Sequence, residues 1–255
     1  IRLCDNPMGA RRESELLERD RKAEHIQLAL EKRMQSDRSF WDDWAFDHVA
    51  LPEVDWAEID TSVSFLERTL RAPLLISCMT GGTGAAKQIN QNLAIAAEQC
   101  QVAIGLGSQR KALEDHAQAR TFQIREQAPT VPLIGNLGAV QLNYGFGIAE
   151  CEACVSMIGA DALALHLNPL QEAIQPEGQC DFSGLLARIG ETARGLSVPV
   201  IVKEIGCGLS GDVGRALAEQ GVRYLDTAGL GGTSWARIEA HRAGDPSLGE
   251  VFANW

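Results

Sequence analysis

Six short apolar runs set the strongest constraint on how this chain can fold. Their apolar residues are continuous rather than alternating, which is typical of strands that are buried on both faces. Helical segments are predicted after several runs, over about 85–99, up to about 158 and up to about 220. Strands that alternate with helices indicate βαβ units and a parallel sheet. The runs occupy residues 73–80, 102–108, 131–138, 162–168, 198–206 and 224–229.

Each run ends in glycine or polar residues, and this feature separates two kinds of α/β fold. The endings read MTGG, GS, GN, HLN, KEIG and TAGLGGT along the chain. A dinucleotide-binding fold places one glycine-rich turn after one strand, whereas a (β/α)8 barrel carries its site on the carboxyl ends of many strands. The sequence therefore predicts an α/β TIM-barrel domain over 73–255 with about six of the eight βα units. The last two units are expected to be absent from this chain.

Residues 1–72 are predicted to form an N-terminal extension that packs on the barrel. A polar helix is expected over 9–35, because its apolar residues follow only a weak helical periodicity. The segment 40–67 concentrates large apolar side chains, including Trp41, Trp44 and Trp56. Such side chains are expected to pack against another surface, such as that of another subunit, and a homo-oligomer is expected.

Charge and hydropathy exclude several classes of protein. Lys and Arg total 23 against 34 Asp and Glu, which gives a net charge of −11. A nucleic-acid-binding protein normally has the opposite balance or a clear basic face. No run approaches the roughly 18 consecutive apolar residues that span a bilayer, and no basic amphipathic stretch suits a membrane surface. We therefore expect neither a nucleic acid nor a membrane as a partner.

The cysteines indicate a reducing compartment. There are seven of them, and they are scattered along the chain rather than spaced as a disulfide framework. The polar N-terminal residues do not resemble a signal peptide. A cytoplasmic location is therefore expected. Cys151 and Cys154 have CxxC spacing, but no second pair or nearby His accompanies them, so they are expected to pack on a helix.

Eight motifs, in order and mostly at the predicted strand ends, are specific enough to point to a family. They are RKxEH at 21–25, MTGGT at 79–83, GSQR at 107–110, GNLG at 135–138, HLNPLQE at 166–172, QPEG at 175–178, VKE at 202–204 and GGTSW at 231–235. The chain resembles the type 2 isopentenyl-diphosphate isomerases along almost its entire length. The resemblance implies a (β/α)8 barrel that interconverts isopentenyl and dimethylallyl diphosphate. It also implies FMN, held reduced with NADPH as the reductant, and Mg²⁺ on the diphosphate.

The resemblance assigns the substrate and metal roles to particular residues. Arg21 and Lys22 would hold the diphosphate, since cations must bind this anion in an acidic protein. Glu172 would bind Mg²⁺, for which a carboxylate is a suitable ligand. His166, Asn168 and Gln171 would contact the substrate. The catalytic residues implied are Gln171, His166 and Lys203.

The resemblance also implies a set of flavin contacts. Main-chain and hydroxyl groups of the MTGG turn would face the isoalloxazine, and two polar side chains would hydrogen-bond the ring edge. Lys203 would stabilise the anionic reduced flavin, which agrees with the high cost of burying an ammonium group without a partner. Glu204 is not the expected partner, because adjacent strand residues point to opposite faces. The implied cofactor residues are Met79, Thr80, Gly81, Ser108, Asn136, Lys203 and Thr233.

Three other functions remain open from the residues alone. A Schiff-base aldolase would use Lys203 as its nucleophile. A flavin enzyme of the hydroxy-acid oxidase kind would share the barrel but would need a His base and Arg residues at the late strands. A truncated, non-catalytic homologue would keep the core motifs. A flavin spectrum separates the first of these from the isomerase.

Overall fold

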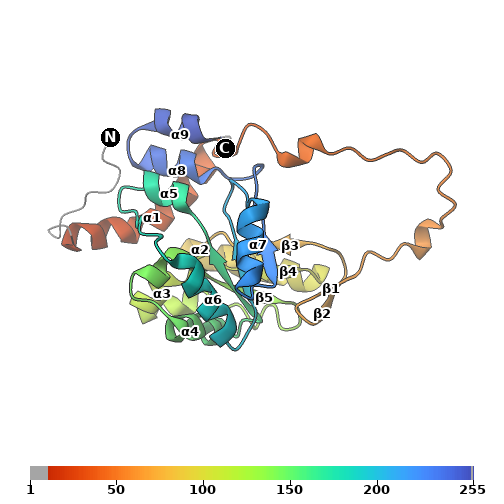
Figure 1. The fold of residues 1–255 in the computed structure, drawn as a ribbon, viewed down its shortest axis with the longest axis horizontal. Coiled ribbons are helices and arrows are strands. Elements are labelled where there is room, and N and C mark those ends of the chain that lie inside the picture. Colours follow the sequence, from red (N-terminus) through yellow and green to blue (C-terminus); the bar gives the residue numbers. More distant parts are fainter. Residues whose placement is uncertain (1–10, 254) are drawn as a thin grey trace.

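The computed structural model describes residues 11–253 and 255, with the side chains described from Arg21 onward. A parallel six-stranded sheet forms its centre, in the sequential order β3-β4-β5-β6-β7-β8 (Figure 1). All six apolar runs contain one of these strands, so the prediction of a parallel α/β sheet is confirmed, and the architecture is TIM-barrel-like. The strands are β3 (Leu75–Ile76), β4 (Ala103–Gly105), β5 (Leu133–Gly138), β6 (Ala162–His166), β7 (Val200–Lys203) and β8 (Tyr224–Asp226).

The two faces of the sheet bury different side chains, which explains why the runs are continuously apolar. On the outer face, Leu133, Leu163 and Val202 belong to a large core with residues of the surrounding helices. On the inner face, Ile134, Ala164 and Ile201 pack with Leu66 from a short hairpin. Because side chains alternate along a strand, both sets of positions must be apolar when both faces are covered.

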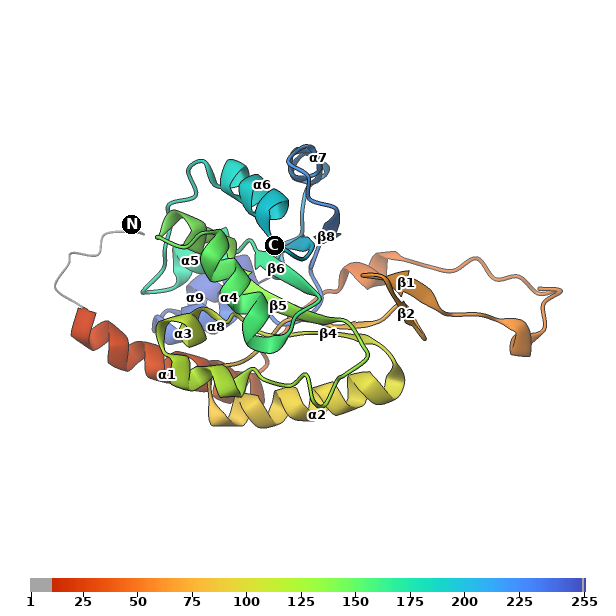
Figure 2. The same cartoon turned by 90° about the horizontal axis from the view of Figure 1, so that it is seen from below.

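Most of the helices that follow a strand cover the outer face of the sheet, whereas those at 169–174, 235–242 and 246–252 pack together near the N-terminal helix (Figures 1 and 2). The predicted helix over 85–99 is α2 (Gly84–Cys100), and Thr83 caps it by accepting from the Ala86 N–H. The predicted segment up to about 158 is divided into the 3-10 helix η4 (Ala139–Asn143) and α4 (Ile148–Ile158). The remaining elements after the strands are α3 (Arg110–Glu114), η3 (His116–Thr121), α5 (Pro169–Ile174), α6 (Leu185–Gly195), α7 (Gly211–Glu219), α8 (Trp235–Arg242) and α9 (Pro246–Phe252).

The N-terminal part contains the long helix α1 (Arg11–Glu31), two 3-10 turns, η1 (Phe40–Asp43) and η2 (Trp56–Glu58), and the hairpin of β1 (Val63–Phe65) and β2 (Arg68–Leu70). After α1, residues 34–40 run beside the loop at 230–234, with the Ser36 and Phe40 N–H groups donating to Gly232 O and Leu230 O. Arg68 fixes the hairpin to the sheet, since its Nη2 donates to Asp161 Oδ1 at 2.6 Å.

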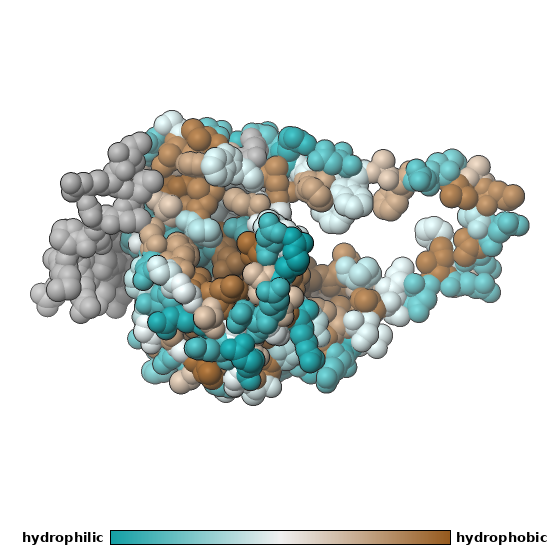
Figure 3. Space-filling model, in the orientation of Figure 1, coloured by the Kyte–Doolittle hydropathy of each residue, from teal (hydrophilic) through white to brown (hydrophobic). Residues whose placement is uncertain are grey.

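Residues 41–62 form an arm that projects away from the sheet (Figure 3). Its large apolar side chains are exposed, with Trp41 at 77% and Trp56 at 87%. The extension therefore contacts the rest of the protein through α1, residues 34–40 and the hairpin, so the end of the predicted aromatic segment packs while its residues 41–62 are exposed. Among the described residues, no helix combines the length and the apolar character needed to cross a membrane.

Candidate active site

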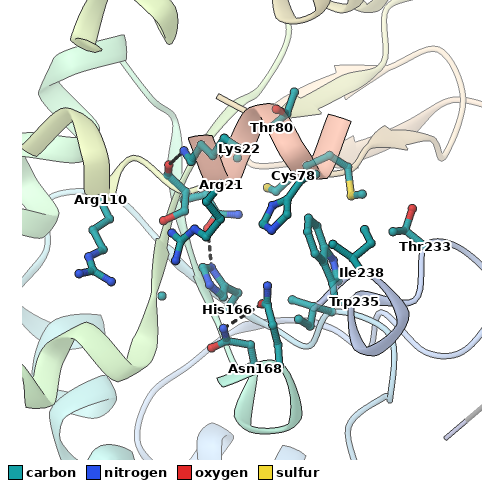
Figure 4. A pocket seen from close by; sticks show the side chains of 18 of the residues that line it. Arg21, Lys22, Cys78, Thr80, Arg110, His166, Asn168, Thr233, Trp235 and Ile238 are labelled. Carbon is teal, nitrogen blue, oxygen red and sulfur yellow. Dashed lines mark hydrogen bonds between the residues drawn. The ribbon is translucent and has the colours of Figure 1, made fainter. Parts of the chain in front are cut away.

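A cavity of about 340 Å³ opens at the carboxyl ends of the strands, beneath α1 (Figure 4). It is where a barrel-like fold would place its site. The cavity brings together residues from all the motifs noted in the sequence. Of the predicted site residues it is lined by Arg21, Lys22, Met79, Thr80, Ser108, Asn136, His166, Asn168, Gln171, Glu172, Lys203 and Thr233.

Strand register explains why residues so distant in sequence meet here. His166 pairs with Lys203 on β7, and Lys203 pairs with Asp226 on β8. These residues lie two positions after inner-face residues such as Ala164 and Ile201, so they share that face by the two-residue period of a strand. The inner face is thus apolar in its lower part and polar at the carboxyl edge.

His166 is held as a neutral imidazole. Its Nδ1 lies 2.7 Å from Asn136 Oδ1. Because a carboxamide oxygen only accepts, Nδ1 carries the proton and Nε2 is left as an acceptor. Burial, aided by the charges of Lys203, Lys22 and Arg21, lowers the pKa of His166 to about 3. His166 therefore offers an acceptor, rather than an imidazolium proton, at neutral pH.

Lys203 has partners that the sequence analysis did not identify. Its side chain is buried, and Nζ donates to the Glu204 main-chain oxygen at 2.6 Å. Nζ also lies 3.8 Å from Asp226 Oδ2 on the neighbouring strand. The neighbouring strand β8 thus brings a carboxylate beside this ammonium. The Glu204 side chain instead accepts from the N–H groups of residues 205–208.

Three cations reach the cavity from two elements. Arg21 and Lys22 come from α1, and Arg110 comes from α3 (Figure 4). Lys22 Nζ donates to Ser108 O at 2.8 Å and lies 5.1 Å from the centre of the Phe122 ring. Burial, with repulsion from Arg21 and Lys111, lowers the pKa of Lys22 to about 7. An anion entering here would relieve that repulsion.

The short helix α5 places three polar side chains on the cavity wall. Asn168 precedes its first turn, and Pro169 begins it. Asn168 Nδ2 donates to Gln171 Oε1 at 3.1 Å and to Glu172 Oε1 at 2.8 Å. Asn168 Oδ1 is buried and has no hydrogen-bond partner. A buried acceptor of this kind requires a donor or a cation, and none of the described residues supplies one.

Glu239 of α8 is the main site residue that the sequence analysis missed. Its side chain is 0% exposed and lies behind Gln171, whose Nε2 donates to Glu239 Oε1 at 2.8 Å. His25 Nε2 of α1 lies 3.1 Å from the same oxygen. Burial opposes ionisation, yet His25, Arg242 and Gln171 together lower the pKa of Glu239 to about 2. The available signal was a glutamate set between apolar Ile238 and Ala240 soon after the GGTSW motif.

Gly81 differs from the other predicted cofactor residues because it is not among those that line the cavity. A side chain at this position would overlap the Phe122 ring, so glycine is needed for packing. Cys151 and Cys154 lie on α4, as predicted. Burial raises the pKa of each thiol to about 12, which suits packing rather than metal binding.

The described residues contain no group of three His, Cys, Asp or Glu side chains arranged to hold a metal ion. Among the described residues that line the cavity, Glu172 is the only carboxylate, and it lies beside the unpartnered Asn168 Oδ1. Mg²⁺ is commonly bound by one or two carboxylates together with substrate phosphates and water rather than by a protein cage. These two residues therefore fit an ion that arrives with a diphosphate.

Comparison with known proteins gives the family. No family model matches the sequence. An isopentenyl-diphosphate delta-isomerase of Synechococcus sp. is 53% identical over 240 residues, which cover 92% of this chain and 69% of the relative. The isopentenyl-diphosphate delta-isomerase of Paracoccus zeaxanthinifaciens is 52% identical over 241 residues, which cover 92% of this chain and 68% of the relative. That of Hydrogenovibrio crunogenus is 49% identical over 240 residues, which cover 92% of this chain and 70% of the relative.

Among solved structures, a putative lactate oxidase of Pediococcus acidilactici has a TM-score of 0.46 at 10% identity, covering 82% of this chain and 56% of that one. A likeness of this extent assigns neither a cofactor nor an activity. The curated relatives do assign a family, because their identity is high over most of both chains. The chain is therefore an enzyme of the isopentenyl-diphosphate delta-isomerase family.

Proposed function

We propose that this protein interconverts isopentenyl and dimethylallyl diphosphate, with reduced FMN and Mg²⁺ in the cavity beneath α1 and NADPH as the source of electrons for the flavin. The observation that carries the proposal is the convergence of three kinds of group on one cavity. Cations from α1 and α3, a carboxylate and amides from α5, and polar inner-face residues of the sheet all line it. The names of the curated relatives support the same substrate.

The diphosphate would bind at the cationic side of the cavity. Arg21, Lys22 and Arg110 would neutralise its charge, and main-chain atoms of residues 107–108 border the same region. Glu172 and Asn168 would hold Mg²⁺ on the phosphate oxygens. This arrangement accounts for the unpartnered Asn168 Oδ1 and for a lysine whose pKa is lowered to about 7 by burial in the absence of an anion.

Residues of the inner face fit a flavin beside this anion site. Met79, Thr80, Ser108, Lys203 and Thr233 all line the cavity. The Lys203 ammonium would favour an anionic ring edge. Reduced FMN would supply the proton donor and acceptor that an allylic double-bond shift requires.

Gln171 and Glu239 would assist the transfer of the proton that leaves or enters the hydrocarbon part of the substrate. Gln171 faces the cavity, while Glu239 is a buried carboxylate behind it. The neutral His166 would orient the substrate or the flavin through its Nε2 acceptor. We also propose that the sheet belongs to a (β/α)8 barrel and that the protein is a cytoplasmic homo-oligomer, as the family resemblance implies.

A binding and turnover experiment tests the proposal. The purified protein is expected to bind FMN, seen in its visible spectrum, and to convert isopentenyl diphosphate when dithionite or NADPH and Mg²⁺ are present. Lys203→Met should weaken FMN binding and turnover, whereas Lys87→Met, outside the cavity, should change neither. Bound FMN without turnover would favour the non-catalytic homologue. Reduction of FMN by a hydroxy acid would favour the oxidase, and borohydride trapping of a carbonyl substrate on Lys203 would favour the aldolase.

A further inference from the structure

We propose that Arg242 is a positioning residue that joins the cation-bearing helix α1 to the Gln171–Glu239 pair. The inference rests on the proposed function, because that function gives the pair its role in proton transfer. It concerns a residue that lines no part of the cavity and belongs to none of the sequence motifs.

Arg242 binds carboxylates from three separate elements. Its Nη1 donates to Glu239 Oε2 at 2.6 Å, its Nη2 to Glu177 Oε1 at 2.9 Å and its Nε to Glu24 Oε2 at 2.9 Å. Its side chain is only 6% exposed. Glu24 lies on α1, Glu177 follows α5, and Glu239 is on α8 itself. One guanidinium, with its fixed planar set of donors, therefore sets the relative positions of three elements around the cavity.

The contact with Glu239 determines how Gln171 is presented. Arg242 occupies Glu239 Oε2, and Oε1 accepts from Gln171 Nε2 with His25 Nε2 of α1 at 3.1 Å. Asn168 donates to the other end of the Gln171 amide. The amide is thus held at both ends, and its orientation depends on a carboxylate that stays ionised in a fully buried position. Burial alone favours the protonated form, and His25, Arg242 and Gln171 together oppose it, with Arg242 as the partner that also binds α1 and the loop after α5.

The other two contacts connect this pair to the substrate cations. Glu24 is on the same helix as Arg21 and Lys22, in the turn that faces the cavity. Arg21 Nη1 also lies 3.7 Å from Glu177 Oε1, the oxygen that Arg242 Nη2 contacts. Loss of Arg242 would therefore loosen the phosphate-binding side and raise the pKa of Glu239 in a single change.

Arg237 provides a matched control. It lies on the same helix, its side chain is also 6% exposed, and it binds two carboxylates, Asp37 and Glu250. These partners lie outside the cavity lining, and Arg237 makes no contact with Gln171 or Glu239 among the described hydrogen bonds and ion pairs. Replacement of either arginine removes a buried cation of α8, but only Arg242 serves the site.

The test compares Arg242→Gln, Arg242→Lys and Arg237→Gln with the wild type. Arg242→Gln should lower kcat roughly 10- to 100-fold, the range for removing an outer partner that orients a site group. Its acidic limb in the pH profile of kcat should move to higher pH, and Arg242→Lys should restore part of both losses. Arg237→Gln should lower thermal stability but keep the wild-type pH profile. Titration of the Glu239 carboxyl by ¹³C NMR should give a raised pKa in Arg242→Gln only.

Equal pH profiles and equal Glu239 titrations in the Arg242 and Arg237 variants would overturn the inference. If Arg242→Gln does not fold, Glu24→Gln removes the most exposed of the three carboxylates that Arg242 binds. This variant should still move the acidic limb of the kcat profile to higher pH, by a smaller amount. If the acidic limb does not shift in Glu24→Gln, and Arg242→Lys has the wild-type kcat and pH profile, the inference is also overturned. Failure of the proposed function itself is distinguishable, since the wild type would then show no turnover, while the NMR titration remains interpretable.

Discussion

Gln171 Nε2 donates to Glu239 Oε1 at 2.8 Å, although 68 residues separate the two in the chain. Two short helices make this contact possible, since α5 and α8 pack against each other above the carboxyl ends of the strands. The buried carboxylate lies behind the amide, and the amide faces the cavity. Under the proposed function, Glu239 would therefore act on the substrate through Gln171 rather than by direct contact.

Glu239→Gln should reduce kcat more than it changes KM. The substitution keeps the shape of the side chain but removes its negative charge. That carboxylate accepts a hydrogen bond from Gln171 and pairs with Arg242. Proton transfer by a positioned group contributes about 10²- to 10⁴-fold, so a loss of kcat in that range is expected. Steady-state assays of the purified variant measure it.

A double-mutant cycle gives the control for this prediction. Because Gln171 and Glu239 act as one unit, Gln171→Ala combined with Glu239→Gln should cost little more than the worse single change. Additive losses would contradict the coupling. Glu191→Gln, on the exposed side of α6, should leave turnover unchanged.

Lys22 should take up a proton when an anion binds. Its pKa in the ligand-free protein is lowered to about 7 by burial, so near pH 8 the amine is mostly neutral. Pyrophosphate with Mg²⁺ should favour the ammonium form and raise that pKa, and affinity should fall as the pH rises through the lowered value. Calorimetry in buffers of different ionisation enthalpy, at about pH 6 and about pH 8, measures the uptake.

Lys22→Met should abolish the part of the uptake that belongs to the protein and leave only that of pyrophosphate itself. Lys32→Met is the control, because Lys32 is exposed just beyond the end of α1. Uptake that is the same in the wild type and in Lys22→Met would show that another group titrates on binding.

The sequence was sufficient to predict the sheet and much of the cavity, for physical reasons that particular residues make clear. Continuous apolar runs such as Val200–Lys203 require burial on both faces. Parallel strands bring their carboxyl ends to one edge, so polar endings such as His166 and Lys203 had to lie close together. The resemblance to a family then suggested substrate, metal and cofactor roles for the residues at these strand ends.

Long-range pairings could not be predicted in the same way. Asp226 became the partner of Lys203 only through the register of β7 and β8. Glu239 has only a weak local signal and Arg242 has none, because their partners are on α1, α5 and the loop after α5.

Glu172→Gln should weaken the binding of pyrophosphate in the presence of Mg²⁺ by about tenfold or more, while binding without metal changes little. Glu172 supplies a carboxylate beside Asn168, whereas an amide is a poorer ligand for a hard cation. Calorimetry with and without Mg²⁺ separates the two effects. Loss of affinity to the same extent in both conditions would contradict a metal role and indicate a disturbed α5.

Asp161→Asn should destabilise the fold without affecting the cavity. Asp161 accepts from Arg68 of the hairpin, from Arg125 and from the Leu133 N–H, so it ties three segments together at the start of β6. Burial opposes ionisation, but these donors outweigh it and lower the pKa of Asp161 below its ordinary value of 3.8. Hydrogen bonds to a charged group are worth about 2 kcal/mol, so a loss of at least that size is expected near neutral pH.

The pH dependence of stability gives this last prediction its sharper form. Because the folded-state pKa of Asp161 is depressed, its contribution is complete above its ordinary pKa and is lost as the pH falls below it. The difference in unfolding free energy between wild type and Asp161→Asn should therefore shrink on acidification. Asp212→Asn is the control, since Asp212 pairs with Arg215 at the surface with its side chain 88% exposed, and such pairs contribute little. A pH-independent difference would mean that Asp161 stabilises the hairpin by packing rather than by its charge.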